Sequence, residues 1–270
     1  CSVLTDDCIE KGLCMDDGGV RYKDSPTLLI SGMINVANSL AAIKKCVFDD
    51  QAMTLKTLKG ALDADFEGDD YKAVHQQLLA APKFGNNDDY VDSIAQQVYD
   101  DYYKEVFSHL NYFGIPYTPG ALSISAHPPF GKACGALPDG RKAGVCLCDA
   151  GVSAAPGTDT KGPTALILSA SKIDALPTLS VLFNMKFHPT ALKGLKGAKN
   201  ILSLIKTFFD LGGWHIQFNV VDSALLREAQ AHPENYRDLV VRVAGFSAYW
   251  VELSQGVQEE IIARTEFGSV

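Results

Sequence analysis

Hydrophobic residues in the first half of the chain recur at the spacing of amphipathic helices. Asn35 and Thr54 are candidate N-cap residues, and each precedes a stretch with this period. The pattern predicts four helices, at 36–47, 55–65, 70–80 and 88–110. This half of the chain is therefore expected to be helical and to pack on a larger body.

The second half alternates between loop, strand and helix patterns. Glycine and proline cluster between 113 and 162, which predicts turns, and His127 and His188 are each expected in a turn because a proline follows them. Runs of branched and aromatic residues predict strands at 179–187, 215–221 and 240–243. Helices are predicted at 195–211, before a glycine pair, and from Ser254 to Arg264. This alternation favours an α/β fold.

Composition narrows the classes of partner and the compartment. The chain has 270 residues, of which 47% are hydrophobic, enough for a large core and one or two domains. The net charge is −8 and the basic residues are scattered, so no nucleic-acid partner is expected. The longest apolar runs, such as 164–170, are far shorter than the roughly 20 residues that span a bilayer. We therefore expect no membrane contact and a cytoplasmic location.

The seven cysteines predict neither a disulfide framework nor a metal centre. An odd number of cysteines in a large apolar chain is typical of a reducing compartment. Cys146 and Cys148 lack the two-residue gap of zinc knuckles, and no second pair lies at zinc-ribbon spacing. Residues 157–162 have the glycine spacing of a phosphate loop, but Pro163 stands where a lysine is needed. No metal site and no nucleotide site are expected.

Five stretches carry the most specific information about function. R-V-A-G-F-S-A-Y-W at 242–250 resembles the radical-bearing loop of the glycyl radical enzymes, a pyruvate formate-lyase-like family. Four further stretches occur in that family's order: D-C-I-E-K-G at 7–12, A-L-P-D-G-R-K-A at 136–143, K-G-P-T-A-L at 161–166 and G-W-H-I-Q-F-N-V-V at 213–221. The tripeptide R-T-E at 264–266 follows the loop. The resemblance covers essentially the whole chain.

The resemblance implies that Gly245 carries an unpaired electron on its Cα. Such a radical flattens and delocalises into the adjacent peptide groups, which a Cβ would hinder, and only glycine has no Cβ. The cofactor is then a protein-derived glycyl radical, and a separate activating enzyme generates it with S-adenosylmethionine and an iron–sulfur cluster. Arg242 and Phe246 are expected to support the radical loop. Gln217 is expected to do so because it alternates with polar neighbours along one face of a strand.

The resemblance also implies the fold and the missing parts. Family members form a ten-stranded α/β barrel from two half-barrels, with the radical loop near the centre. This chain matches the C-terminal third, with 1–130 as the end of the barrel domain and 131–270 as the glycine radical domain. Its opening residues look like the middle of a helix, so a preceding half-barrel is expected. The complete enzyme is expected to be a homo-oligomer.

A second radical residue is expected outside this chain. In the family the glycyl radical takes a hydrogen atom from a cysteine, whose thiyl radical then attacks the substrate. Cys8 and Glu10 have the Cys-x-Glu look of that motif, but a glycine precedes the family's cysteine, and D-C-I-E-K-G matches a later segment. We expect Cys8 to pack within a helix. The chain alone is therefore expected to be inactive.

Two positions bear on the class of substrate. Glu10 matches a segment from which arylacetate decarboxylases of the family place a glutamate near the ring substituent. Leu122 stands where dehydratases of small polyols often have a tyrosine. Leucine favours an apolar substrate, because burying a substrate hydroxyl without a partner costs about 1–3 kcal/mol. The F-S-A-Y-W variant at 246–250 also resembles the arylacetate decarboxylases.

The first prediction for the reaction is decarboxylation of an arylacetate by a glycyl radical lyase, with a small organic substrate. Two alternatives remain open. One is elimination of water or an amine from a diol or from an amino-alcohol such as choline. The other belongs to a different class: a non-catalytic spare part that only replaces a damaged radical loop.

Overall fold

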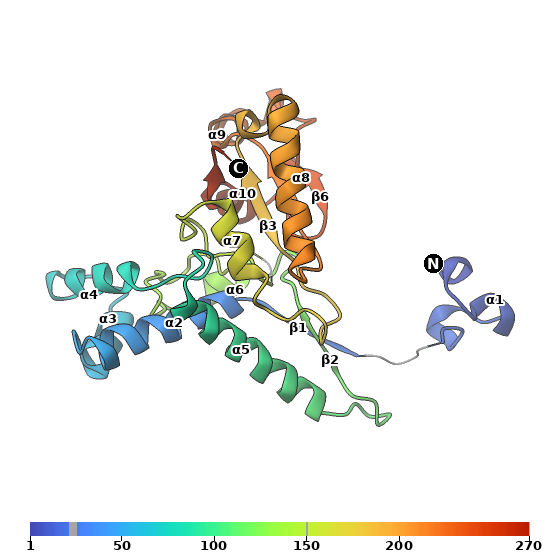
Figure 1. Ribbon diagram of the computed structural model, residues 1–270, viewed down its shortest axis with the longest axis horizontal. Coiled ribbons are helices and arrows are strands. Elements are labelled where there is room, and N and C mark those ends of the chain that lie inside the picture. The colour runs from blue at the N-terminus through green and yellow to red at the C-terminus, as the bar shows by residue number, and fades with distance from the viewer. Residues whose placement is uncertain (22–25, 150, 270) are drawn as a thin grey trace.

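A computed structural model describes residues 1–21, 26–149 and 151–269 of the chain. Residues 1–21 lie apart from the rest of the molecule in Figure 1. They contain the short helix α1 (Cys8–Lys11) between two 3-10 turns, η1 (Ser2–Leu4) and η2 (Met15–Asp17). The opening residues thus form a turn, where the sequence suggested the middle of a helix. Cys8 is buried within α1, as expected.

The four helices predicted for the first half are present with shifted ends. They are α2 (Met33–Ile43), extended by the π-helix η3 (Lys44–Asp49), α3 (Leu55–Asp63), α4 (Asp69–Ala80) and α5 (Asp89–Ser108). Thr54 caps α3 as predicted, because its hydroxyl accepts a hydrogen bond from the Thr57 amide at 3.0 Å. Asn35 is not a cap: α2 begins earlier, after Gly32, whose φ of +83° suits glycine.

Seven strands form three small sheets within the described residues. In the first sheet β1 (Thr27–Ile30) pairs in parallel with β2 (Thr118–Ala121). The second has the order β4 (Gln217–Val220), β3 (Asn184–Phe187), β7 (Glu266–Phe267), all parallel. The third is an antiparallel hairpin of β5 (Val240–Arg242) and β6 (Ser247–Tyr249). The three predicted strands are therefore present, each shorter than its hydrophobic run.

The remaining helices surround these sheets. They are α6 (His127–Ala133), α7 (Pro163–Ala170), α8 (Gly194–Asp210), α9 (Ser223–Ala231) and α10 (Gln255–Ala263), with 3-10 turns η4 (Pro189–Leu192), η5 (Pro233–Asn235) and η6 (Trp250–Glu252). In Figure 1, α7 to α10 and the β3 sheet form the upper part of the molecule and α2 to α5 the lower part. The sequence predicted α8 and α10 but not α6, α7 or α9.

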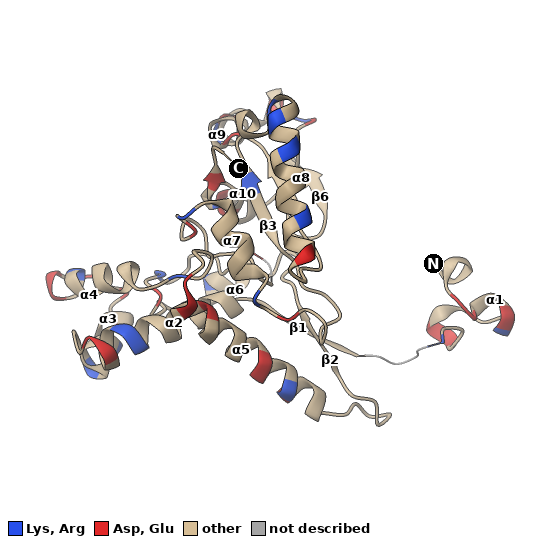
Figure 2. Ribbon diagram, in the orientation of Figure 1, with Lys and Arg blue, Asp and Glu red and all other residues tan. Residues whose placement is uncertain are grey.

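The hydrophobic core joins the two parts. Its largest cluster includes Ile34 and Tyr99 of the lower helices, Phe187 of the upper sheet and Phe183, which directly precedes β3. A separate cluster around the fully buried Trp250 lies between the hairpin, α9 and α10. Figure 2 shows acidic and basic positions on most helices, with a row of lysines along α8. None of the described helices is long and apolar enough to cross a bilayer.

Candidate functional site

Gly245 lies at the tip of the β5–β6 hairpin. Its φ is +88°, a region that disfavours every residue with a Cβ, and a Cβ built there would lie 3.3 Å from Leu182 Cδ1. The Val243 amide donates to the Phe246 carbonyl at 2.9 Å and closes the turn. Gly245 itself is exposed in this chain, whereas Val243 is fully buried. The tip of the hairpin, which contains Gly245, is therefore exposed, whereas Val243 at its base is buried.

Arg242 connects this tip to the neighbouring strand. Its guanidinium donates to the Gly245 carbonyl at 3.3 Å, to Ser247 Oγ at 3.3 Å and to Gln217 Oε1 at 2.7 Å. The structure thus brings together three of the residues predicted from sequence, Gly245, Arg242 and Gln217. Phe246 also belongs to the turn, but it contributes its backbone carbonyl, and the residue is 37% exposed.

Two amides that alternate along β4 continue the connection. Asn219 makes a two-way bridge to the backbone of Arg242, accepting from its amide at 2.7 Å and donating to its carbonyl at 2.6 Å. Gln217 donates to the side chain of Asn184 on β3. Asn184 in turn donates to the Asp149 carboxylate and to the Val243 carbonyl, the latter at 3.4 Å. Side chains thus replace a backbone ladder between the hairpin and the sheet.

A group of buried charges lies behind the hairpin. Arg264 donates to the Val243 carbonyl at 2.9 Å and to both oxygens of Glu260 at 2.9 and 2.8 Å. It also lies 3.1 Å from the Asp149 carboxylate. His127 Nε2 lies 3.2 Å from Glu260 Oε2, an oxygen that also accepts from Arg264. Arg242 thus holds the carbonyl of the peptide that follows Gly245, whereas Arg264 holds the Val243 carbonyl, in the peptide one step before those that flank the glycine.

The pKa shifts of Arg264 and Glu260 favour the charged form of both side chains. Burial opposes ionisation of Glu260, but Arg264 and His127 outweigh it and lower the pKa of Glu260 to about 2. Burial also opposes the charge of Arg264, yet the carboxylates of Asp149 and Glu260 raise its pKa. Burial raises the pKa of Asp149. The pair of Arg264 and Glu260 is therefore ionised at every physiological pH.

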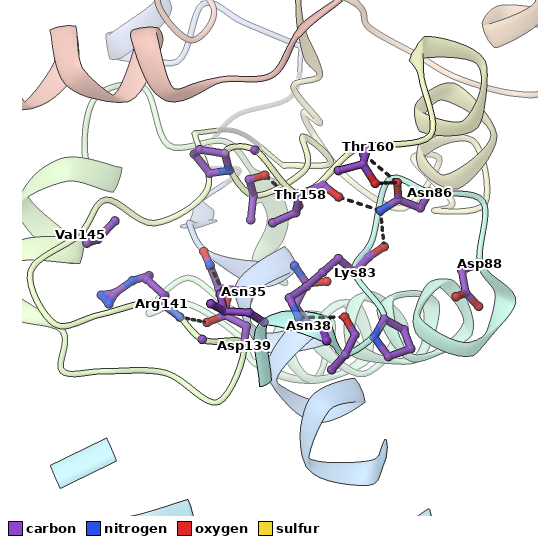
Figure 3. Close-up of a pocket in the computed structure, with 18 of the residues that line it drawn as sticks. Asn35, Asn38, Lys83, Asn86, Asp88, Asp139, Arg141, Val145, Thr158 and Thr160 are labelled. Atoms are coloured by element: carbon purple, nitrogen blue, oxygen red, sulfur yellow. Dashed lines mark hydrogen bonds between the residues drawn. The ribbon is translucent and has the colours of Figure 1, made fainter. Parts of the chain in front are cut away.

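The two residues predicted for a substrate pocket lie elsewhere. Leu122 directly follows β2 and is half-buried, beside Ser123, whose hydroxyl contacts His127 Nδ1 at 3.0 Å. Glu10 is exposed on α1, in the segment that lies apart from the rest. A cavity of about 520 Å³ lies between α2, α4 and the loops 139–146 and 155–161 (Figure 3). It is lined by none of the six residues predicted for the site.

Sequence reasoning missed most of the support for the hairpin. Asp149 and Asn184 come from separate parts of the chain, and although Glu260 and Arg264 are four residues apart, no local spacing joins that pair to the other two or to the hairpin. His127 was expected in a turn because Pro128 follows, but it opens α6 and is completely buried. The R-T-E tripeptide contained the one usable signal, since a charged residue after an apolar helix is rarely buried without a partner.

The comparisons with known proteins agree with this geometry. A pyruvate formate lyase-like family model matches residues 1–131, and a glycine radical family model matches residues 148–251, which include the hairpin. The chain belongs to the glycyl radical enzymes. The glycine radical domain implies that a member of this family carries a protein-derived glycyl radical.

Individual glycyl radical enzymes resemble the whole chain. The indoleacetate decarboxylase of Tractidigestivibacter scatoligenes is 47% identical over 100% of this chain and 33% of its own length. The trans-4-hydroxy-L-proline dehydratase of Clostridioides difficile is 42% identical over 98% of this chain and 33% of its own. The glycerol-bound structure of the B12-independent glycerol dehydratase from Clostridium butyricum superimposes with a TM-score of 0.90, at 44% identity, over 99% of this chain and 34% of its own. The chain thus spans about a third of the length of the relatives that it matches.

Proposed function

We propose that Gly245 stores the radical and passes it to a cysteine outside this chain. The observation that carries this proposal is the position of Gly245 at positive φ, with its own carbonyl held by Arg242 and the base of its hairpin held by Arg264 at the Val243 carbonyl. A radical on its Cα spreads into the two flanking peptide groups, and Arg242 fixes the carbonyl of one of them, the Gly245–Phe246 peptide. Arg242, Gln217 and Phe246 are the supporting residues in this proposal.

The proposal includes a barrel of which this chain forms only the C-terminal part. The exposed hairpin is accessible to a separate activating enzyme, which uses S-adenosylmethionine and an iron–sulfur cluster to remove a hydrogen atom from Gly245. An upstream half-barrel then covers the hairpin and excludes oxygen, with 1–130 and 131–270 contributing to the barrel and the glycine radical domain. The complete enzyme acts in the cytoplasm as a homo-oligomer.

Decarboxylation of an arylacetate is the reaction that we propose first. It is supported by the 47% identity to an indoleacetate decarboxylase and by leucine at position 122, which offers a substrate no hydrogen-bond partner. Glu10 contacts the substrate only if the segment 1–21 packs against the barrel in the complete enzyme. The second candidate is dehydration of a small alcohol, which the likeness to the glycerol dehydratase structure supports.

Electron paramagnetic resonance of the activated, full-length protein tests the radical. We expect a glycine-centred doublet after anaerobic activation, and its complete loss in the variant Gly245→Ala. The matched control is Gly212→Ala: Gly212 has a similar φ of +92° but lies at the end of α8, so this substitution introduces the same backbone strain and leaves the doublet intact. A doublet that persists in Gly245→Ala would contradict the assignment.

The same activated sample distinguishes the two reactions. Indoleacetate or 4-hydroxyphenylacetate should release carbon dioxide, whereas glycerol should give no aldehyde. Turnover of glycerol with no release of carbon dioxide from either arylacetate supports the dehydratase and overturns the first proposal. The spare-part alternative predicts turnover of neither substrate unless an oxygen-damaged partner enzyme is added.

A further inference from the structure

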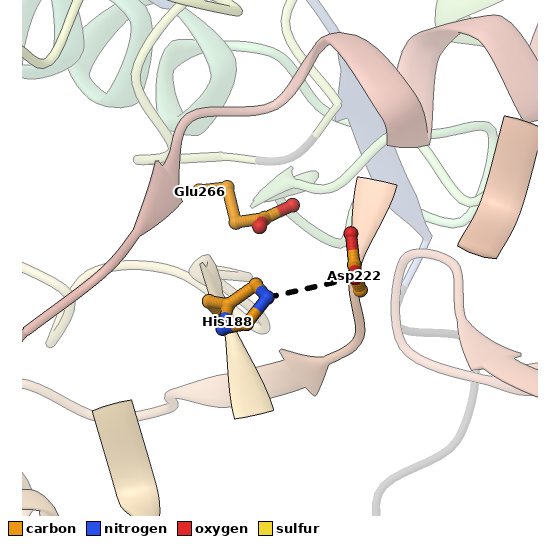
Figure 4. A group of neighbouring side chains, drawn as sticks. All are labelled: His188, Asp222 and Glu266. Atoms are coloured by element: carbon orange, nitrogen blue, oxygen red, sulfur yellow. Dashed lines mark ion pairs between the residues drawn. The ribbon is translucent and has the colours of Figure 1, made fainter. Parts of the chain in front are cut away.

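Three potential metal ligands converge at one edge of the β4-β3-β7 sheet. His188 follows β3, Asp222 lies two residues after the end of β4, and Glu266 begins β7. The three strands are parallel, and Glu266 pairs with Lys186 in the two-residue strand β7, so this short strand and the carboxyl ends of β3 and β4 bring the three residues to the same edge. One ligand atom from each lies within 4.8 Å of the others, and Figure 4 shows the three side chains facing a common space.

Each of these side chains has one polar atom that contacts a neighbouring protein group. His188 Nδ1 lies 2.6 Å from Thr190 Oγ1, Asp222 Oδ1 accepts from the Ala224 amide at 2.7 Å, and Glu266 Oε2 accepts from the Ser223 amide at 2.9 Å. The other atoms, His188 Nε2 and Asp222 Oδ2, lie 3.5 Å apart. Partners that fix the far atom of a ligand are typical of metal centres, where they orient the ring and the carboxylates.

The dimensions and charges suit a divalent cation. Two ligands at about 2.1 Å from a tetrahedral zinc ion are separated by about 3.4 Å, close to the observed distance between His188 and Asp222. Buried Lys186 lies 3.7 Å from Glu266 Oε2, the oxygen that also faces Ser223, and so does not occupy the central space. With one ammonium near two carboxylates, the group retains net negative charge.

We propose that His188, Asp222 and Glu266 bind one divalent first-row transition metal ion. One imidazole with two carboxylates suits zinc, manganese or iron(II) better than the all-oxygen surroundings that calcium and magnesium prefer. The remaining positions are open to water. The ion joins the ends of three strands and thereby fixes β7, two residues after Arg264. This inference does not depend on the radical chemistry.

Zinc binding to the full-length protein, without activation, tests this site. After treatment with a chelator and dialysis, calorimetric titration with Zn²⁺ should show one site per chain with micromolar or tighter affinity, and bound Zn²⁺ should raise the melting temperature. Asp222→Asn should weaken that affinity at least tenfold. Asparagine keeps an oxygen for the Ala224 amide, so the cap of α9 survives while the metal-facing oxygen becomes a nitrogen donor.

A matched control comes from another histidine–carboxylate pair. His232 and Glu234 lie 3.6 Å apart and are exposed, and His232→Gln should leave the zinc affinity unchanged. If Asp222→Asn fails to fold, His188→Gln provides the same comparison. Equal zinc affinity of wild type and the folded ligand variant overturns the proposal. So does the absence of binding to wild type at about 100 μM Zn²⁺, roughly a hundred times the expected dissociation constant.

Discussion

Arg264 is the residue on which the buried charges behind the hairpin depend. Its guanidinium contacts Glu260, Asp149 and the Val243 carbonyl, and each of these groups is buried. Removing a buried charge costs far more than removing an exposed one, because the remaining partner is left uncompensated in a low-dielectric interior. The lowered pKa of Glu260 shows the same dependence, since Arg264 outweighs the effect of burial on that carboxylate.

Arg264→Met should therefore destabilise the protein by about 3–5 kcal/mol, because it leaves two buried carboxyl groups without their cation. Denaturant unfolding measures the difference. The control is Arg227→Met, which breaks an exposed pair with Glu259 at 2.7 Å and should cost less than about 1 kcal/mol. Equal effects of the two substitutions would contradict the view that the charges behind the hairpin are structural.

At the scale of single residues, the sequence alone identified Gly245 but few of the residues that hold its hairpin. Gly245 and Arg242 stand within one motif, and Gln217 alternates with polar neighbours on a predicted strand, so local spacing was sufficient. Asn184 and Arg264 reach the hairpin from 61 and 19 positions away from Gly245, and only the tertiary fold joins them. The ligands of the proposed metal site were missed for the same reason.

The element that fixes the hairpin is β4, acting through side chains instead of a continuous ladder. Asn219 satisfies both backbone groups of Arg242, as a neighbouring strand would. Such a bridge aligns β5 with the sheet while leaving the turn at Gly245 free of the sheet. The hydrophobic pattern predicted both strands but not this link, because periodicity reports which face is buried and not which groups pair.

Asn219→Asp should loosen the hairpin without unfolding the sheet. The aspartate retains an acceptor for the Arg242 amide but places a second oxygen against its carbonyl, so we expect a cost of about 1–3 kcal/mol. Hydrogen exchange of the Arg242 amide should then accelerate about tenfold or more. Asn235→Asp, on the exposed turn η5, serves as the control and should leave that rate unchanged. An unchanged rate in Asn219→Asp would show that the bridge does not hold β5.

Helix prediction was more successful than strand prediction for a physical reason. The four helices of the first half have strong amphipathic periods, which the sequence pattern detects. The helices α7 and α9, which begin after Gly162 and Asp222, were missed because the apolar residues around them did not predict a helix. The β1–β2 pair joins Thr27 to Thr118, and a parallel pair of this separation leaves no turn signal in the sequence.

On the scale of the whole molecule, Gly245 is exposed in this chain, and the proposed radical requires the proposed half-barrel to cover it. The chain spans about a third of the relatives that it matches, and the hairpin tip lies on its surface. A carbon radical in that position reacts with oxygen unless other polypeptide covers it. The proposed radical on Gly245 therefore requires the proposed half-barrel. The residue at which oxygen breaks the chain shows directly where the radical is stored.

Mass spectrometry of the activated, full-length protein after exposure to air is the most direct test of the central claim. Oxygen adds to the carbon that carries the radical, so the backbone should break at Gly245 and nowhere else in this chain. Activated Gly245→Ala and unactivated wild type should both remain whole. An activated wild-type chain that stays intact in air, or that breaks at another residue, would contradict radical storage at Gly245.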